Sequence, residues 1–186
     1  MKCRILGIVV FASISSFTSL IAQTSAGQSS LMISNSTQAS VLNAVEAAKI
    51  MPVSVFFRGQ SASIQGRNSA GVRFGDKSLV LVSLVDTSGY SSQVQEKYQA
   101  YLITESALDI DGHQLAPGAY GCGFIGVDSF VVMDLGGHDL FAAHSTRDVD
   151  LHRPTPLQIL AAPNTPGTYR LYAGRNYVPF RIGAAK

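Results

Sequence analysis

The chain has 186 residues, with 14 Lys and Arg against 12 Asp and Glu, and a formal net charge of +2. Lys2 and Arg4 precede an apolar run, and removal of that segment would leave 12 basic and 12 acidic residues. A neutral chain without a long run of like charge lacks the basic field that attracts nucleic acid or anionic membranes. We therefore expect no nucleic-acid partner.

The first 26 residues have the pattern of a secretory signal peptide. The basic start is followed by an apolar run over 5–21 and then by small residues, with candidate cleavage sites after Ala22 and Ala26. A retained membrane anchor is the alternative, although five Ser and Thr residues within the run weaken a spanning helix. We predict export to the periplasm or the cell exterior, with no membrane span after cleavage.

Cleavage would also remove Cys3 and leave Cys122 as the single cysteine, so no internal disulfide is expected. Residues 27–36 are small and polar and predict a flexible lead-in. Residues 37–186 are enough for one sizeable core and predict a single β-rich domain.

The pattern changes from helical to extended early in this domain. Ala-rich spacing predicts a short helix within 37–51, and Pro52 would end it. From Val53 onward apolar residues alternate with other residues, which is typical of strands. The run over 78–85 is apolar on both faces and predicts a strand that is covered on both sides.

A second short helix is predicted from Ser92 to Tyr98, because Ser92 and Gln95 have capping-box spacing, and a strand follows over 100–104. Successive strands then alternate with turns predicted at 111–112, 117–118, 126–128 and 136–137. An extended exposed segment (152–156), a strand (157–162) and a hairpin (168–173 with 177–182) complete the chain. Pro179 cannot donate to a strand ladder, so the last strand is expected at a sheet edge.

These elements predict an all-β fold, a single antiparallel β-barrel or β-sandwich with one or two short helices, preceded by a signal peptide. The short strands at close spacing and the near absence of helical patterns support this fold class.

The stretch GCGFIG, residues 121–126, matches the glycine spacing of dinucleotide-binding sites. Such a site needs a helix after the glycines, but the sequel VDSFVVMDLGG predicts another strand. Strand alternation places Cys122 on one face with Tyr120 and Phe124, which favours a buried thiol that fills the core over a nucleophile.

The stretch 134–152 contains imidazole and carboxylate groups, which are ligands of divalent metals. The candidate ligands are His138, His144, His152, Asp134 and Asp139. The histidines are six and eight residues apart, which matches no short ligand motif, so polar residues facing water are the preferred interpretation. A divalent metal is thus an alternative, and no cofactor is the main expectation.

Three arginines, Arg58, Arg67 and Arg73, are the candidates for an anionic ligand site. Arginines in such a pattern more often lie on a solvated strand face, which is the preferred interpretation. No catalytic residue is predicted, because the serine-hydrolase pattern G-x-S-x-G is absent and no Ser has an identifiable partner.

The run from Leu108 to Phe124 contains the pattern I-x-G-x-x-L-x-P-G-x-Y-G, a strand–turn–strand unit. With FFRGQSA, DTSGYSS, QEKYQAYLITE, GGHDL and RPTPLQ, it resembles an uncharacterised family of secreted bacterial proteins, known only as a domain of unknown function. The resemblance covers most of the chain from Val53 to Phe180. It implies a signal peptide and an all-β domain, and it implies no catalytic residue.

We expect an exported, non-enzymatic binding or structural domain whose ligand lies in a barrel mouth or on a sheet face. A metal-assisted hydrolase that uses the His and Asp residues of 134–152 is the first alternative. A protein-interaction module that uses an edge strand or the 152–156 segment is the second. The partner would accordingly be a small molecule or a protein.

Overall fold

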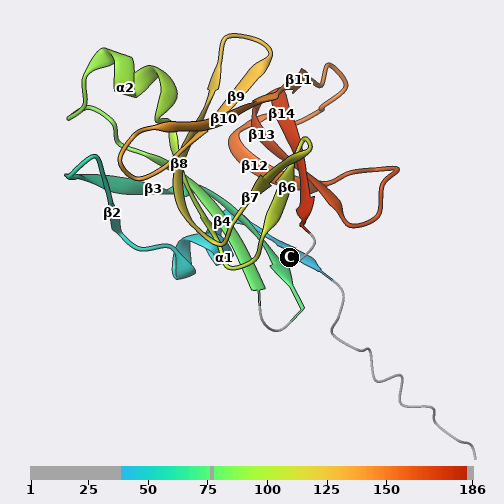
Figure 1. Cartoon of the computed structure of the whole chain (residues 1–186). Coiled ribbons are helices and arrows are strands. Elements are labelled where there is room, and N and C mark those ends of the chain that lie inside the picture. The colour runs from blue at the N-terminus through green and yellow to red at the C-terminus, as the bar shows by residue number, and fades with distance from the viewer. Residues whose placement is uncertain (1–38, 76–77, 184–186) are drawn as a thin grey trace, which may run out of the picture. The chain divides into compact units, whose positions relative to one another are not determined.

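The computed structural model of the protein describes residues 39–75 and 78–183, and all structural statements below concern these residues. The predicted signal peptide (1–26) and lead-in (27–36) lie outside the described residues and stay predictions. Within the described part, most residues form strands, arranged in two antiparallel sheets (Figure 1).

The larger sheet has eight strands in the order β1-β3-β4-β5-β8-β9-β10, with β2 also paired to β3. Its strands are β1 (Ser40–Leu42), β2 (Ser54–Phe57), β3 (Gln60–Phe74), β4 (Ser78–Val85), β5 (Ala100–Thr104), β8 (Gly118–Ile125), β9 (Ser129–Met133) and β10 (Asp139–His144). The long strand β3 pairs with β2 at its start, with β1 near its end and with β4 on its other side.

The smaller sheet has six strands in the order β12-β13-β14-β6-β7, with β11 paired to β14. Its strands are β6 (Leu108–Ile110), β7 (His113–Leu115), β11 (Thr146–Arg147), β12 (Thr155–Ala161), β13 (Thr168–Gly174) and β14 (Asn176–Ile182). Over the described residues the sheets do not close into a barrel, so the all-β prediction is confirmed in its sandwich form.

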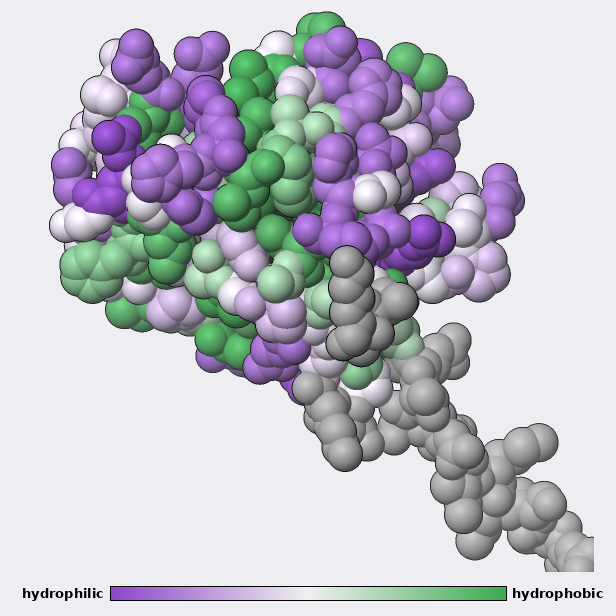
Figure 2. Space-filling model, in the orientation of Figure 1, coloured by the Kyte–Doolittle hydropathy of each residue, from purple (hydrophilic) through white to green (hydrophobic). Residues whose placement is uncertain are grey.

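The edges of the two sheets meet at β7 and β10. The His113 ring on β7 stacks on the Phe141 ring of β10, with ring centroids 4.7 Å apart. Figure 2 shows a band of hydrophobic residues that passes over the β10 region between two hydrophilic margins. Phe141 also packs against the main core, so this edge contact closes one side of the sandwich.

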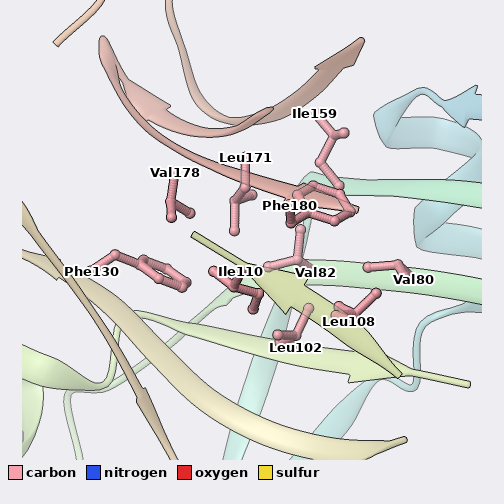
Figure 3. A pocket seen from close by; sticks show the side chains of 10 residues that line it. All are labelled: Val80, Val82, Leu102, Leu108, Ile110, Phe130, Ile159, Leu171, Val178 and Phe180. Atoms are coloured by element: carbon pink, nitrogen blue, oxygen red, sulfur yellow. The ribbon is translucent and has the colours of Figure 1, made fainter. Parts of the chain in front are cut away.

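The main core lies between the sheets. Figure 3 shows its central side chains, which come from both sheets and point toward one another: Val80, Val82, Leu102, Leu108, Ile110, Phe130, Ile159, Leu171, Val178 and Phe180. The void that they enclose has a volume of about 10 Å³. A single water needs at least about that much space and polar partners, so the interior is a filled apolar core without room for a ligand.

The outer face of the eight-stranded sheet is covered as well. One apolar cluster lies under β2 and the helix α2 (Ser92–Lys97), and another lies under the helix α1 (Ala44–Ile50). Strand β4 therefore sends Val80 and Val82 into the main core and Leu81 and Val85 into the outer clusters. The prediction that 78–85 is covered on both sides is confirmed.

The first helix is shorter than predicted. Residues Ser40–Leu42 form β1 instead of the helix start, and α1 begins only at Ala44. The reason is a capping box at Asn43, whose side chain accepts from the backbone of Glu46, while the Glu46 carboxylate accepts from the backbone of Asn43. The residues before the Asn43 cap pair with β3 as strand β1, and the residues after the cap form α1.

The second predicted helix forms, but its cap differs from the expected one. The N-cap of α2 is Ser91 instead of Ser92, and no side chain makes a capping hydrogen bond there. The strand boundaries confirm the predicted strand at 100–104 and the turns at 111–112, 126–128 and 136–137. Of the turn predicted at 117–118, only Pro117 lies between strands, because Gly118 is already the first residue of β8.

The expectation that the last strand is an edge is wrong, because β14 pairs with β13 on one side and with β6 and β11 on the other. The Pro179 carbonyl accepts from the Asp111 backbone at 3.2 Å, so the Pro179 nitrogen faces the same side. On that side of β14, the pairing with β11 ends at Tyr177, and the pairing with β6 starts at Phe180. The missing N–H thus falls in the gap between two partner strands.

Candidate functional site

An open cleft of about 430 Å³ lies on the outer side of the eight-stranded sheet. Three segments enclose it: α2, the turn between β2 and β3, and the loop between β9 and β10. Its lining residues are Phe57, Arg58, Gln93, Val94, Glu96, Lys97, Met133 and Gly137. The volume lies within the range of pockets that bind small molecules.

Arg58 has an unusual backbone conformation at the rim of this cleft. Arg58 and Gly59 form a two-residue hairpin turn with φ angles of 50° and 76°, the combination of a type I′ turn. Asn, Asp and Gly are the residues that normally occupy the first position, because other side chains are strained at positive φ. The second such turn of the protein has the usual sequence, Asp111-Gly112, with φ angles of 48° and 87°.

Several contacts hold the Arg58 turn in place. The Tyr90 hydroxyl donates to the carbonyl oxygens of Phe57 and Gln60, which flank the turn, at 3.1 and 3.0 Å. The Arg58 backbone N–H donates to the Leu135 carbonyl at 2.8 Å. The surrounding structure thus fixes a strained residue, which is a pattern found at binding sites.

The Arg58 side chain lies directly against Gly137 in the β9–β10 loop. A Cβ atom at Gly137 would lie 2.6 Å from Arg58 Cδ and 2.8 Å from Arg58 Cγ. Gly137 also has a φ of 86°, so its position suits glycine for two reasons. The aliphatic part of Arg58 is therefore packed against the loop.

The other wall of the cleft, α2, approaches the sheet through a glycine on β8. A Cβ atom at Gly123 would lie 2.2 Å from the Lys97 carbonyl oxygen, so only glycine lets the helix end come this close. Next to it, the buried Tyr98 ring stacks on Phe57 with centroids 3.9 Å apart. Burial raises the pKa of Tyr98, and among the described residues its hydroxyl has no hydrogen-bond partner.

The two basic side chains of the cleft differ in whether an acidic residue already pairs with them. Lys97 Nζ is 2.5 Å from Asp139 Oδ2, an exposed ion pair that links α2 to β10. Arg58 forms no salt bridge within the described residues. Glu96 and Gln93 add a carboxylate and an amide, while Phe57, Val94 and Met133 form an apolar floor. The arrangement fits a small ligand with an anionic group and an apolar part.

The structure separates the three arginines that the sequence indicated. Arg58 lines the cleft, whereas Arg67 lines a shallow groove beside α1 with Val45, Lys49 and others. Arg73 lies near the end of β3, opposite Ser40 of β1. The three do not converge on one site.

The five candidate metal ligands are also spread out. Asp134 and His138 contact each other, with 3.0 Å between Asp134 Oδ2 and His138 Nδ1. The backbone N–H of His138 also donates to Asp134 and holds the pKa of that carboxyl below its usual range. Asp139 pairs with Lys97, and His144 and His152 lie at the end of β10 and in the exposed segment before β12.

Within the described ranges, no three His, Cys, Asp or Glu side chains lie close enough together to hold a metal ion. A divalent metal at these residues stays a prediction.

Cys122 lies on β8 and is 1% exposed, within the main core against which Tyr120 and Phe124 also pack. Burial raises the pKa of the Cys122 thiol to about 12, which disfavours the reactive thiolate. The residues after GCGFIG form strand β9 instead of a helix. Both interpretations of this stretch, as strand and as core filler, are confirmed.

The sequence did not predict the residues that accompany Arg58 in the cleft, such as Gln93, Glu96, Lys97 and Met133. They come from segments that are distant along the chain and meet only in the folded sheet. One signal was available: Arg58-Gly59 stands between two extended runs, where a two-residue hairpin turn is expected.

No family model, no curated protein and no solved structure matches this chain. The resemblance to the secreted bacterial family therefore stays a prediction. Among residues 39–75 and 78–183, no helix is both long and apolar enough to cross a membrane.

Proposed function

We propose that the protein is an exported, non-enzymatic binding module that takes a small anionic ligand with an apolar part into the cleft beside α2. The observation that carries the proposal is Arg58, which is held at positive φ in a turn where Asn, Asp or Gly is normal. The conformation costs stability, and the residue that adopts it is an arginine whose side chain lines the cleft.

The chemistry of the lining supports binding. A guanidinium binds carboxylate, sulfonate or phosphate groups through paired N–H donors, and Arg58 is free of an acidic partner within the described part of the chain. Val94 offers partly exposed apolar surface in the same cleft, with Phe57 and Met133 buried beneath the lining. The filled core leaves no space between the sheets, so the ligand belongs on the sheet face and not in an interior cavity.

The proposal that the protein is exported depends on the sequence. The basic start and apolar run over 5–21 predict a signal peptide, and Cys122 is buried in the core, away from any partner in solution. Cys122 is the single cysteine of the described residues, so the fold there depends on its apolar clusters, which cover both faces of the eight-stranded sheet.

The test uses anilinonaphthalene sulfonate, a fluorescent anion with an apolar ring system, as a probe of the folded protein. Replacement of one charged hydrogen-bonding group costs about 1.5–3 kcal/mol. We therefore expect Arg58→Gln to weaken probe binding by roughly 10-fold to 100-fold. Arg73→Gln is the matched control, because Arg73 lies away from the cleft and should leave the affinity unchanged.

Equal affinity for the wild type and Arg58→Gln would contradict the proposal. Thermal melting in the presence of zinc tests the alternative that the protein binds a divalent metal. If the His and Asp residues of 134–152 bind a divalent metal, zinc should raise the melting temperature of the protein and chelator should reverse the rise. His138→Ala should then abolish that rise, whereas Arg58→Gln should not affect it.

A further inference from the structure

Three large apolar side chains, Ile50, Val53 and Phe56, are exposed within seven consecutive residues. Their exposed fractions are 41%, 87% and 66%. We call these three residues the apolar patch. Single exposed apolar residues are ordinary, but a cluster on a soluble surface usually marks an interaction site.

The fold presents this patch on a well-held segment. Met51 is buried under α1, and Pro52 ends the helix, so the chain turns outward at Val53. Val55 and Phe57 point into the cluster under α2, which leaves Phe56 on the opposite side of β2. Figure 2 shows hydrophobic residues gathered at the lower left, over β2.

Charge is distributed unevenly along the chain. Residues 39–67 contain three basic residues, Lys49, Arg58 and Arg67, and one acidic residue, Glu46, a net charge of +2. Residues 68–183 contain 8 basic and 11 acidic residues, a net charge of −3. The neutral total thus hides a basic sequence segment that carries the patch, followed by a segment with an excess of acidic residues.

We propose that the apolar patch inserts into the surface of an anionic lipid bilayer, with Lys49 and Arg67 at the lipid headgroups. Apolar side chains beside basic ones are the combination by which proteins bind such surfaces. Lys49 and Arg67 line one groove with the exposed Val45, so these cations are neighbours in the fold.

The inference is independent of the ligand in the cleft, because the patch and these two cations do not line the cleft. A protein partner is the other occupant to distinguish. Complementarity of charge favours the lipid, since the neighbouring cations Lys49 and Arg67 would face the anionic headgroups.

The absence of Trp from the chain allows a site-specific test. The full chain with Phe56→Trp is mixed with vesicles of phosphatidylcholine containing phosphatidylglycerol, and Trp emission is recorded. We expect emission to shift to shorter wavelength as the ring leaves water. Val127→Trp is the matched control, because Val127 is 75% exposed in the turn between β8 and β9, and its emission should stay unchanged.

This comparison is valid even if residues 5–21 bind lipid themselves, because the two chains differ only in the position of the Trp. Lys49→Glu in the Phe56→Trp chain should weaken partitioning at least about fivefold. Three results would overturn the proposal: no shift at Phe56→Trp, equal shifts at both Trp positions, or an equal shift on vesicles of phosphatidylcholine alone.

Discussion

Arg58→Asn should give a more stable protein than Arg58→Gln, and both substitutions should weaken ligand binding in the cleft. Arg58 occupies the first position of a type I′ turn with φ at 50°, where Asn is a preferred residue. The change removes the guanidinium that lines the cleft and relieves the backbone strain at the same position. Arg58→Gln is the matched comparison, because Gln also lacks the charge but has no preference for positive φ.

The magnitude follows from the cost of the left-handed conformation. That cost is roughly 1–2 kcal/mol for an ordinary residue, and Asn avoids part of it. Arg58 also packs its aliphatic part against Gly137, and both substitutions lose most of that contact. The difference between Arg58→Asn and Arg58→Gln therefore isolates the turn, and we expect Asn to be more stable by about 0.5–1 kcal/mol.

Thermal unfolding followed by circular dichroism measures this difference. For a domain of this size, 1 kcal/mol corresponds to roughly 2–4 °C in Tm, so Arg58→Asn should melt about 1–4 °C above Arg58→Gln. Both variants should bind anilinonaphthalene sulfonate more weakly than the wild type. If Arg58→Gln is the more stable of the two, the turn is not strained and the reasoning about Arg58 fails.

Three further predictions concern the rest of the fold. Gly123→Ala places a Cβ 2.2 Å from the Lys97 carbonyl oxygen, so it should cost about 1–3 kcal/mol in urea unfolding, whereas Gly89→Ala, with no atom nearer than 3.8 Å, should stay within about 0.5 kcal/mol of the wild type. Cys122 should resist a thiol reagent in the native state and react in denaturant, since burial raises its pKa to about 12; fast native labelling would show that the strand opens. Asp109 accepts a hydrogen bond from Arg181 at 2.9 Å, and chiefly this bond holds the pKa of the Asp109 carboxyl below the ordinary 3.8. The ionised carboxylate should therefore stabilise the fold above pH 3.8, and this stabilisation should be lost as the pH falls below that value. Asp109→Asn should lose less Tm than the wild type between neutral and acidic pH, and parallel curves of Tm against pH would contradict the pairing.

The strands and turns of this protein were largely predictable because local chemistry determines them. Asp111-Gly112 needs positive φ at both residues, and the sequence offers the pair that tolerates it. Residues 78–85 are apolar on both faces because a sheet on one side and helices on the other cover them. The choice of sandwich over barrel was not predictable, since it depends on which distant strands pair.

The errors have a common cause, which is that neighbouring segments override local preference. Pro179 predicted an edge strand, but it lies inside the sheet at the gap between β6 and β11, where no partner strand requires an N–H from it. Ser40–Leu42 fits a helical stripe, yet β3 offers a partner strand and Asn43 caps the helix after it. Neither alternative is visible without knowing what lies beside the segment.

The cleft depends on close approaches that a sequence does not display. Gly123 stands in GCGFIG, where its spacing with Gly121 and Gly126 imitates a phosphate-binding loop. In the fold, Gly121 and Gly123 face away from the core, where added Cβ atoms would meet Phe57 at 2.5 Å and the Lys97 backbone at 2.2 Å. Because these two glycines let Phe57 and the end of α2 lie flat on β8, they set the position of the cleft floor and of Lys97. The stretch thus contributes to the candidate site because its two glycines have no side chains. Substitution of either glycine should alter ligand binding without removing any group that touches the ligand.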